Sequence, residues 1–140
     1  VSGGGPTAAV DEGAAAEPLP EELAGCTTLT GAEAIDCFSA YTEANPQDPD
    51  GWTQFGLFAI QSGISGGGSA QLFEAGETFI GRALEIDPGD VEARVYLAVL
   101  LERTGRVDEA ATELARLDGV DIPAALTPLV ELVERGVAAG

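Results

Sequence analysis

The side chains that most often perform enzyme chemistry are scarce in this chain. It contains no His, Lys or Met, only two Cys, and its six basic residues are all Arg, against 24 Asp and Glu. Without His or Lys, the usual general base at neutral pH and the amine that forms Schiff bases are missing. A catalytic thiol would also lack a His to activate it. The groups that remain for catalysis are carboxylates, the two thiols and hydroxyls.

Pairs of Glu at helical spacing are the one catalytic arrangement that the sequence offers. They are Glu131 with Glu134, and Glu109 with Glu113. Two carboxylates could serve a hydrolase as general acid and base, and a raised carboxylate pKa in a pocket would support that role. Residues three or four apart also form the ordinary solvated face of a helix. We therefore predict that the chain is not an enzyme, with a small carboxylate-dependent hydrolase as the alternative.

Cys26 and Cys37 are the only thiols, and two states are open for them. A disulfide would close a short loop and contribute roughly 3 kcal/mol to stability if the chain-entropy account holds. It would also indicate an oxidising compartment, because disulfides persist there. Two reduced thiols are the other state, and the sequence does not decide between the two.

No segment has the pattern of a metal or cofactor site, so we predict neither. The Gly-rich stretch 63–69 lacks the Lys-Ser/Thr that completes a phosphate-binding loop. The acidic turns at 48–50 and 87–90 lack the long loop and terminal Glu of a calcium site. We expect the turns to cap helices and the Gly-rich stretch to form a solvated loop.

The composition indicates one acidic globular domain. The chain has 140 residues, 45% of them hydrophobic, and a formal net charge of −18. Such a charge repels nucleic acid and anionic membrane surfaces and leaves apolar or basic protein partners open. The longest apolar run, residues 95–101, is too short to cross a bilayer, so we expect no direct membrane insertion.

The elements that must position these residues are all expected to be helices. Residues 1–22, rich in Gly, Ala, Pro and acid, predict a flexible N-terminal tether, and residues 23–140 predict a helical domain. Thr30 with Glu33 fits a capping box at the start of the first helix. Apolar residues recur at helical spacing in six segments. The predicted helices are 31–44, 50–62, 70–86, 91–104, 107–118 and 127–137.

One pattern repeats along the chain. Ala34, Phe38 and Pro46 have the same spacing as a later trio, which is Gly76, Ile80 and Pro88. The two Pro are 42 positions apart, and we attribute the excess over about 34 residues to the Gly-Ser insertion.

This pattern resembles the tetratricopeptide repeat family over residues 30–135. The family's Trp, Leu, Gly and Tyr positions are occupied by Trp52, Phe55, Gly56 and Ala59 in one unit, and by Arg94, Leu97, Ala98 and Leu101 in the next. Arg94 departs from the pattern, while Gly56 is small enough to let a neighbouring helix come close. The resemblance implies an all-α fold, a short right-handed α-solenoid of about six helices in antiparallel pairs.

The resemblance also implies a non-catalytic module that binds a partner protein or peptide in a concave groove. Carried onto matching positions, the groove residues are Thr53, Leu57, Ile60, Gln61, Val95, Val99, Glu102 and Arg103. Alternatively, Leu57 and Val99 pack against the tether or the last helix. With no Lys in the chain, a groove that clamps acidic tails is not expected. The tether and possible disulfide predict a bacterial, extracytoplasmic scaffold or assembly factor, held at a membrane by a segment preceding Val1.

Overall fold

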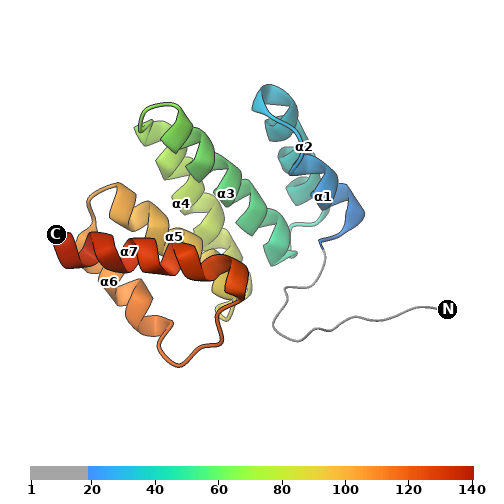
Figure 1. Cartoon of the computed structure of the whole chain (residues 1–140). Helices are drawn as coiled ribbons and strands as arrows, with labels where there is room; N and C mark the ends of the chain where they lie inside the picture. Colours follow the sequence, from blue (N-terminus) through green and yellow to red (C-terminus); the bar gives the residue numbers. More distant parts are fainter. Residues whose placement is uncertain (1–18) are drawn as a thin grey trace.

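The fold consists of helices alone over residues 19–140, the part of the chain that the computed structural model describes (Figure 1). No strand occurs among these residues, which confirms the predicted all-α class. The elements are α1 (Glu21–Cys26), α2 (Gly31–Ala44), α3 (Pro49–Ser65), α4 (Ala70–Ile86), α5 (Val91–Arg103), α6 (Val107–Arg116), the 3-10 turn η2 (Ala124–Leu126) and α7 (Thr127–Ala139).

The helix that the sequence did not predict is α1. The predicted tether reached residue 22; its first 18 residues lie outside the described part, but Glu21 and Glu22 form the first turn of α1. Leu23 and Cys26 are buried in the contact with α2. Six residues are too few to show a periodic pattern, and so short a helix is unstable by itself in water. Its existence therefore depends on packing that the local sequence does not reveal.

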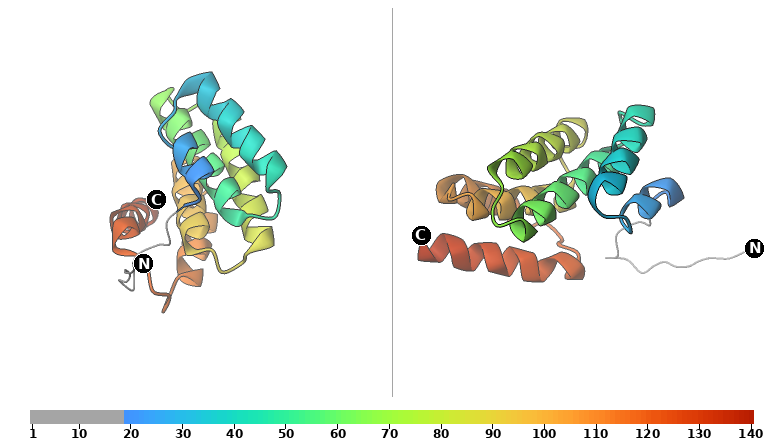
Figure 2. Two further views of the ribbon diagram at one scale, coloured as in Figure 1. Left: turned by 90° about the vertical axis from the view of Figure 1, so that its right-hand side faces the viewer. Right: turned by 90° about the horizontal axis from the view of Figure 1, so that it is seen from above.

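Successive helices pack against one another and build a row of antiparallel pairs (Figures 1 and 2). α3 contacts both α4 and α5, α5 contacts α6, and α7 packs on α5 and α6. In both views of Figure 2, α5 lies between α4 and α7. The last helix therefore covers the face of α5 that points away from α4.

Close approach of α3 and α4 depends on glycine, as predicted for Gly56. A Cβ at Gly56 would lie 2.5 Å from Ile80 Cγ1, and a Cβ at Gly76 would lie 3.1 Å from Ile60 Cγ1. Neither position has room for a side chain without a shift of its neighbours.

The Gly-rich insertion is shorter than predicted because α3 continues through Ser65. Gly63 belongs to the helix and faces Phe73, whose Cε1 would lie 3.1 Å from a Cβ at that position. The helix then ends where Gly67 and Gly68 adopt φ of +85° and +93°, and the Gly68 N–H donates to the Gly63 carbonyl at 2.8 Å. The loop predicted from residue 63 thus begins only at residue 66.

Two of the acidic turns cap helices, as predicted. Asp48 Oδ1 accepts the Asp50 N–H at 3.0 Å at the start of α3, and Asp90 Oδ1 accepts the Ala93 N–H at 3.0 Å at the start of α5. The capping box predicted for Thr30 is wrong, because its side chain accepts no backbone N–H, although it does precede α2.

The apolar interior has two parts. One joins α1, α2 and α3 and contains Phe38 stacked on Phe55, with ring centroids 5.4 Å apart. Phe55 also stacks on Phe79 of α4 at 3.9 Å. The other part is mainly aliphatic and extends from α3 to α7. It includes Val99, Leu100 and Val133.

Candidate partner-binding groove

The groove residues predicted on α5 are largely covered by α7. Val95 and Val99 are 1% and 7% exposed, and both belong to the apolar interior that includes Val133 of α7. The Glu102 side chain lies against α7, since a Cβ at Gly136 would be 2.5 Å from Glu102 Cδ. Only Arg103 of this group is exposed. The burial of Val99 in an apolar interior shared with α7 agrees with the alternative noted from the sequence, packing against the last helix.

The four residues predicted on α3 divide into two buried and two accessible ones. Thr53 is fully buried and its hydroxyl donates to Asp90 Oδ2 at 2.9 Å, while Ile60 is 2% exposed. Leu57 is half-buried and Gln61 is exposed. These last two line an open cleft beside α3.

This cleft, of about 440 Å³, lies between α3 and the segment that joins α1 to α2. We call it the α3 cleft. Not one of its lining residues is Asp, Glu, Lys or Arg, in a chain with 24 acidic residues. The lining is Cys26, Thr27, Leu29, Thr30, Gly31, Phe38, Gln54, Leu57, Phe58, Gln61, Ser62 and Ser65.

Most of the cleft lining was not predicted from the sequence. The residues from α3 recur at spacings of three and four, which is a helical stripe and could have been recognised. The opposite wall, from Cys26 to Gly31, could not have been recognised, because α1 itself was not predicted. The wall exists only once α1 is folded back on α2.

The structure joins Cys26 and Cys37 in a disulfide, one of the two states that the sequence left open. Their Cα atoms are 5.5 Å apart. The bond ties the end of α1 to the middle of α2, and Cys26 also lines the α3 cleft. The disulfide thus holds one wall of the cleft in place.

Gln54, a lining residue of the cleft, connects it to carboxylates at the start of α5. Gln54 lines the cleft, is 7% exposed and donates its Nε2 to Glu92 Oε2 at 3.2 Å. The same oxygen accepts the Tyr96 hydroxyl at 2.7 Å, and burial, followed by this bond, raises the pKa of Tyr96. Burial also raises the pKa of nearby Asp90. Among residues 19–140, no Arg pairs with Glu92 or Asp90.

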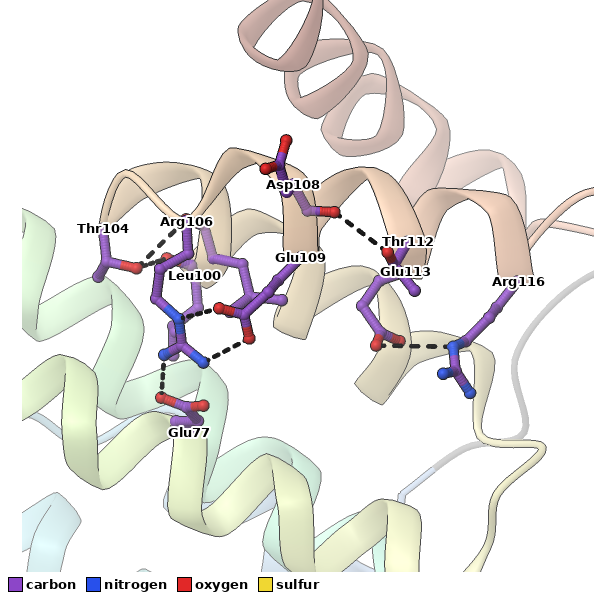
Figure 3. A network of polar contacts seen from close by, with 10 residues as sticks. Glu77, Leu100, Thr104, Arg106, Asp108, Glu109, Thr112, Glu113 and Arg116 are labelled. Carbon is purple, nitrogen blue, oxygen red and sulfur yellow. Dashed lines mark hydrogen bonds and ion pairs between the residues drawn. The ribbon is translucent and has the colours of Figure 1, made fainter. Parts of the chain in front are cut away.

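The Glu pairs considered for catalysis have other partners or are solvent-exposed. Figure 3 shows Arg106 between Glu109 and Glu77 of α4, with ion-pair distances of 2.8 and 2.7 Å. Hydrogen bonding to Arg106 lowers the pKa of Glu109, the opposite of what a general acid requires. Glu113 binds Arg94 at 2.6 Å, whereas Glu131 and Glu134 are exposed on α7. The Arg106–Glu77 pair thus connects the start of α6 to α4, and the Arg94–Glu113 pair connects α5 to α6.

Within the described residues, no helix combines the length and apolar character needed to cross a membrane. The same residues contain no group of three or more His, Cys, Asp or Glu arranged to hold a metal ion.

Comparison with known proteins returned one match, to a family. Residues 70–121, which span α4, α5, α6 and the start of the loop that follows, match the tetratricopeptide repeat model. Neither the curated proteins nor the solved structures gave a significant match. The helix pairs and the glycine-mediated packing agree with this match. The segment from α4 to the loop after α6 is therefore similar to a tetratricopeptide repeat.

Proposed function

We propose that this protein is a non-catalytic interaction module that holds a segment of a partner protein in the α3 cleft. Tetratricopeptide repeats are generally protein-interaction modules. The single observation that carries the proposal is the open cleft on α3, lined by neutral side chains and including Leu57 and Gln61. Pockets of about 300 to 1,000 Å³ with apolar walls and a few polar groups are typical binding sites.

The proposed binding site is shorter than the groove that the family resemblance implies. Burial of Val95 and Val99 removes these two residues of α5 from direct contact with a partner. Partner binding is therefore assigned to α3 and to the wall formed by residues 26–31.

We place the protein outside the cytoplasm, as a scaffold or assembly factor held at a membrane. The support is the Cys26–Cys37 disulfide, since such bonds persist in oxidising compartments. Thiol alkylation of protein taken from its native compartment, with and without prior reduction, tests the location. Labelling of both Cys without a reductant would contradict it.

Site-specific photo-crosslinking in the native host tests partner binding. A photoreactive residue at exposed Gln61 should capture a defined partner, whereas the same residue at exposed Val120, in the loop before η2, should not. Leu57→Glu should abolish capture from position 61, because it puts a charge into the cleft. Equal capture from both positions, or capture unaffected by Leu57→Glu, would reject the α3 cleft as the binding site.

The alternative, a carboxylate-dependent hydrolase, gains no support from the described residues. Glu109 has a lowered pKa and Glu113 is paired with Arg94. Asp90 has a raised pKa, but it caps α5 and does not line the α3 cleft.

A further inference from the structure

We infer that the α3 cleft selects a partner segment in which an apolar side chain lies within a few residues of Arg or Lys. This inference rests on the proposed function and adds the chemistry of the partner to it. It follows from the neutral lining of the cleft and from the unpaired carboxylates behind one of its ends.

The apolar part of the lining is suited to one aliphatic or aromatic side chain. Phe38, Leu57 and Phe58 contribute apolar surface, and Cys26 lines the same cleft. The polar lining residues are hydroxyls and amides, namely Thr27, Thr30, Gln54, Gln61, Ser62 and Ser65. Such groups can bind a backbone but give no compensation to a charged side chain entering the cleft.

At one end of the cleft, Gln54 lies between the neutral lining and the carboxylate of Glu92. Its side chain is almost completely buried, lines the cleft and reaches Glu92 of α5. Both donors to Glu92, the Gln54 amide and the Tyr96 hydroxyl, are neutral, so they orient the carboxylate without cancelling its charge. Asp90, held by Thr53 and the Ala93 N–H, adds a second uncancelled carboxylate nearby.

None of the six arginines of the chain, all of which lie in the described part, forms an ion pair with Glu92. Four of them pair with Glu residues in the described part. These four are Arg82, Arg94, Arg106 and Arg116. A positive group that compensates Glu92 would therefore come from the partner. The net charge of −18 favours the approach of the same kind of segment and repels acidic ones.

Selection from a displayed library of random 12-residue peptides, using the full chain as bait, tests this inference. Peptides that bind wild type and not Leu57→Glu should be enriched in an apolar residue within a few positions of Arg or Lys. Fluorescence polarisation with an enriched peptide should show binding that weakens about tenfold or more with Leu57→Glu. Glu92→Gln keeps an acceptor for Gln54 and Tyr96 and should weaken binding up to about fivefold, an effect that added salt reduces.

Val120→Glu is the control, because it also adds a charge at an exposed apolar residue but lies outside the cleft. It should leave peptide affinity unchanged. Enriched peptides that lack basic residues, or equal binding by wild type and Glu92→Gln, would overturn the inferred partner chemistry. In either case the proposed function would stand if Leu57→Glu still abolished binding. Failure of photo-crosslinking at position 61 would instead reject the proposed function itself.

Discussion

The same helical face is covered at one end of this short array and partly open at the other. At the C-terminal end, α7 lies on α5 and buries Val95 and Val99. At the N-terminal end, the six-residue α1 leaves α3 partly uncovered, so that Leu57 and Gln61 line an open cleft. The C-terminal helix α7 is 13 residues long, whereas the N-terminal helix α1 has only 6 residues. Matching positions in a repeat can thus be core at one end and line an open cleft at the other.

The largest effect on stability is expected when the same charge is introduced at the two matching positions, 57 and 99. Val99→Glu should lower the free energy of unfolding by about 3 kcal/mol or more, because it buries an unpaired carboxylate beneath α7. Leu57→Glu should lower it by about 1 kcal/mol or less, since that side chain faces the open cleft. Urea unfolding followed by circular dichroism measures both. Similar losses for the two variants would mean that the ends are equally covered.

The disulfide should matter only for the N-terminal end. Replacing both Cys26 and Cys37 by Ser should lower the free energy of local unfolding of α1 and the start of α2 by roughly 3 kcal/mol in the chain-entropy model. Hydrogen exchange should accelerate in α1 and the first turns of α2, because α1 makes its main helix contact with α2. Faster exchange throughout α5, α6 and α7 would contradict the separation between the two ends.

Ion pairing should matter chiefly at the C-terminal end. The Arg94 and Glu113 side chains are only 15% and 14% exposed, so Arg94→Met should cost about 2 kcal/mol by leaving Glu113 with only its 3.8 Å contact to Arg116. Arg82→Met is the matched control, because the Arg82 and Glu85 side chains are 42% and 71% exposed. It should change stability by less than about 0.5 kcal/mol. Equal losses in urea unfolding would show that burial does not strengthen the Arg94 pair.

The smallest effect concerns the junction between α3 and α5. Burial raises the pKa of Asp90 in the folded state, so the folded chain binds a proton there more readily than the unfolded chain. The ionised form is thus penalised at neutral pH, and the penalty disappears as the pH falls. The stability of wild type relative to Asp90→Asn should therefore increase as the pH is lowered from about 7 to about 4. A constant difference across that range would contradict the burial of a charged Asp90.

Helix existence was predictable wherever a long segment carried its own pattern. The six predicted helices have apolar residues at helical spacing, and Asp48 and Asp90 lie where caps are needed. α1 has neither the length nor the pattern, and α3 runs past Gly63 because that glycine packs on Phe73. Both errors arise where contacts with another helix decide the local conformation.

The candidate site was less predictable than the fold. Family resemblance identified the helical face, and Leu57 and Gln61 do line the cleft. It could not show that α7 covers Val99, because burial depends on which helix packs there. Nor could it show that Gln54 links the cleft to Glu92, since these residues are 38 positions apart.

The sequence by itself therefore determined the class of fold, most helix positions and the acidic charge, since these follow from local periodicity and composition. Only the tertiary structure decided which part of the repeated face is open, because that depends on how far α1 and α7 extend over their neighbours. The same packing brought together the neutral cleft and the carboxylates at its end, and no local pattern could have related them.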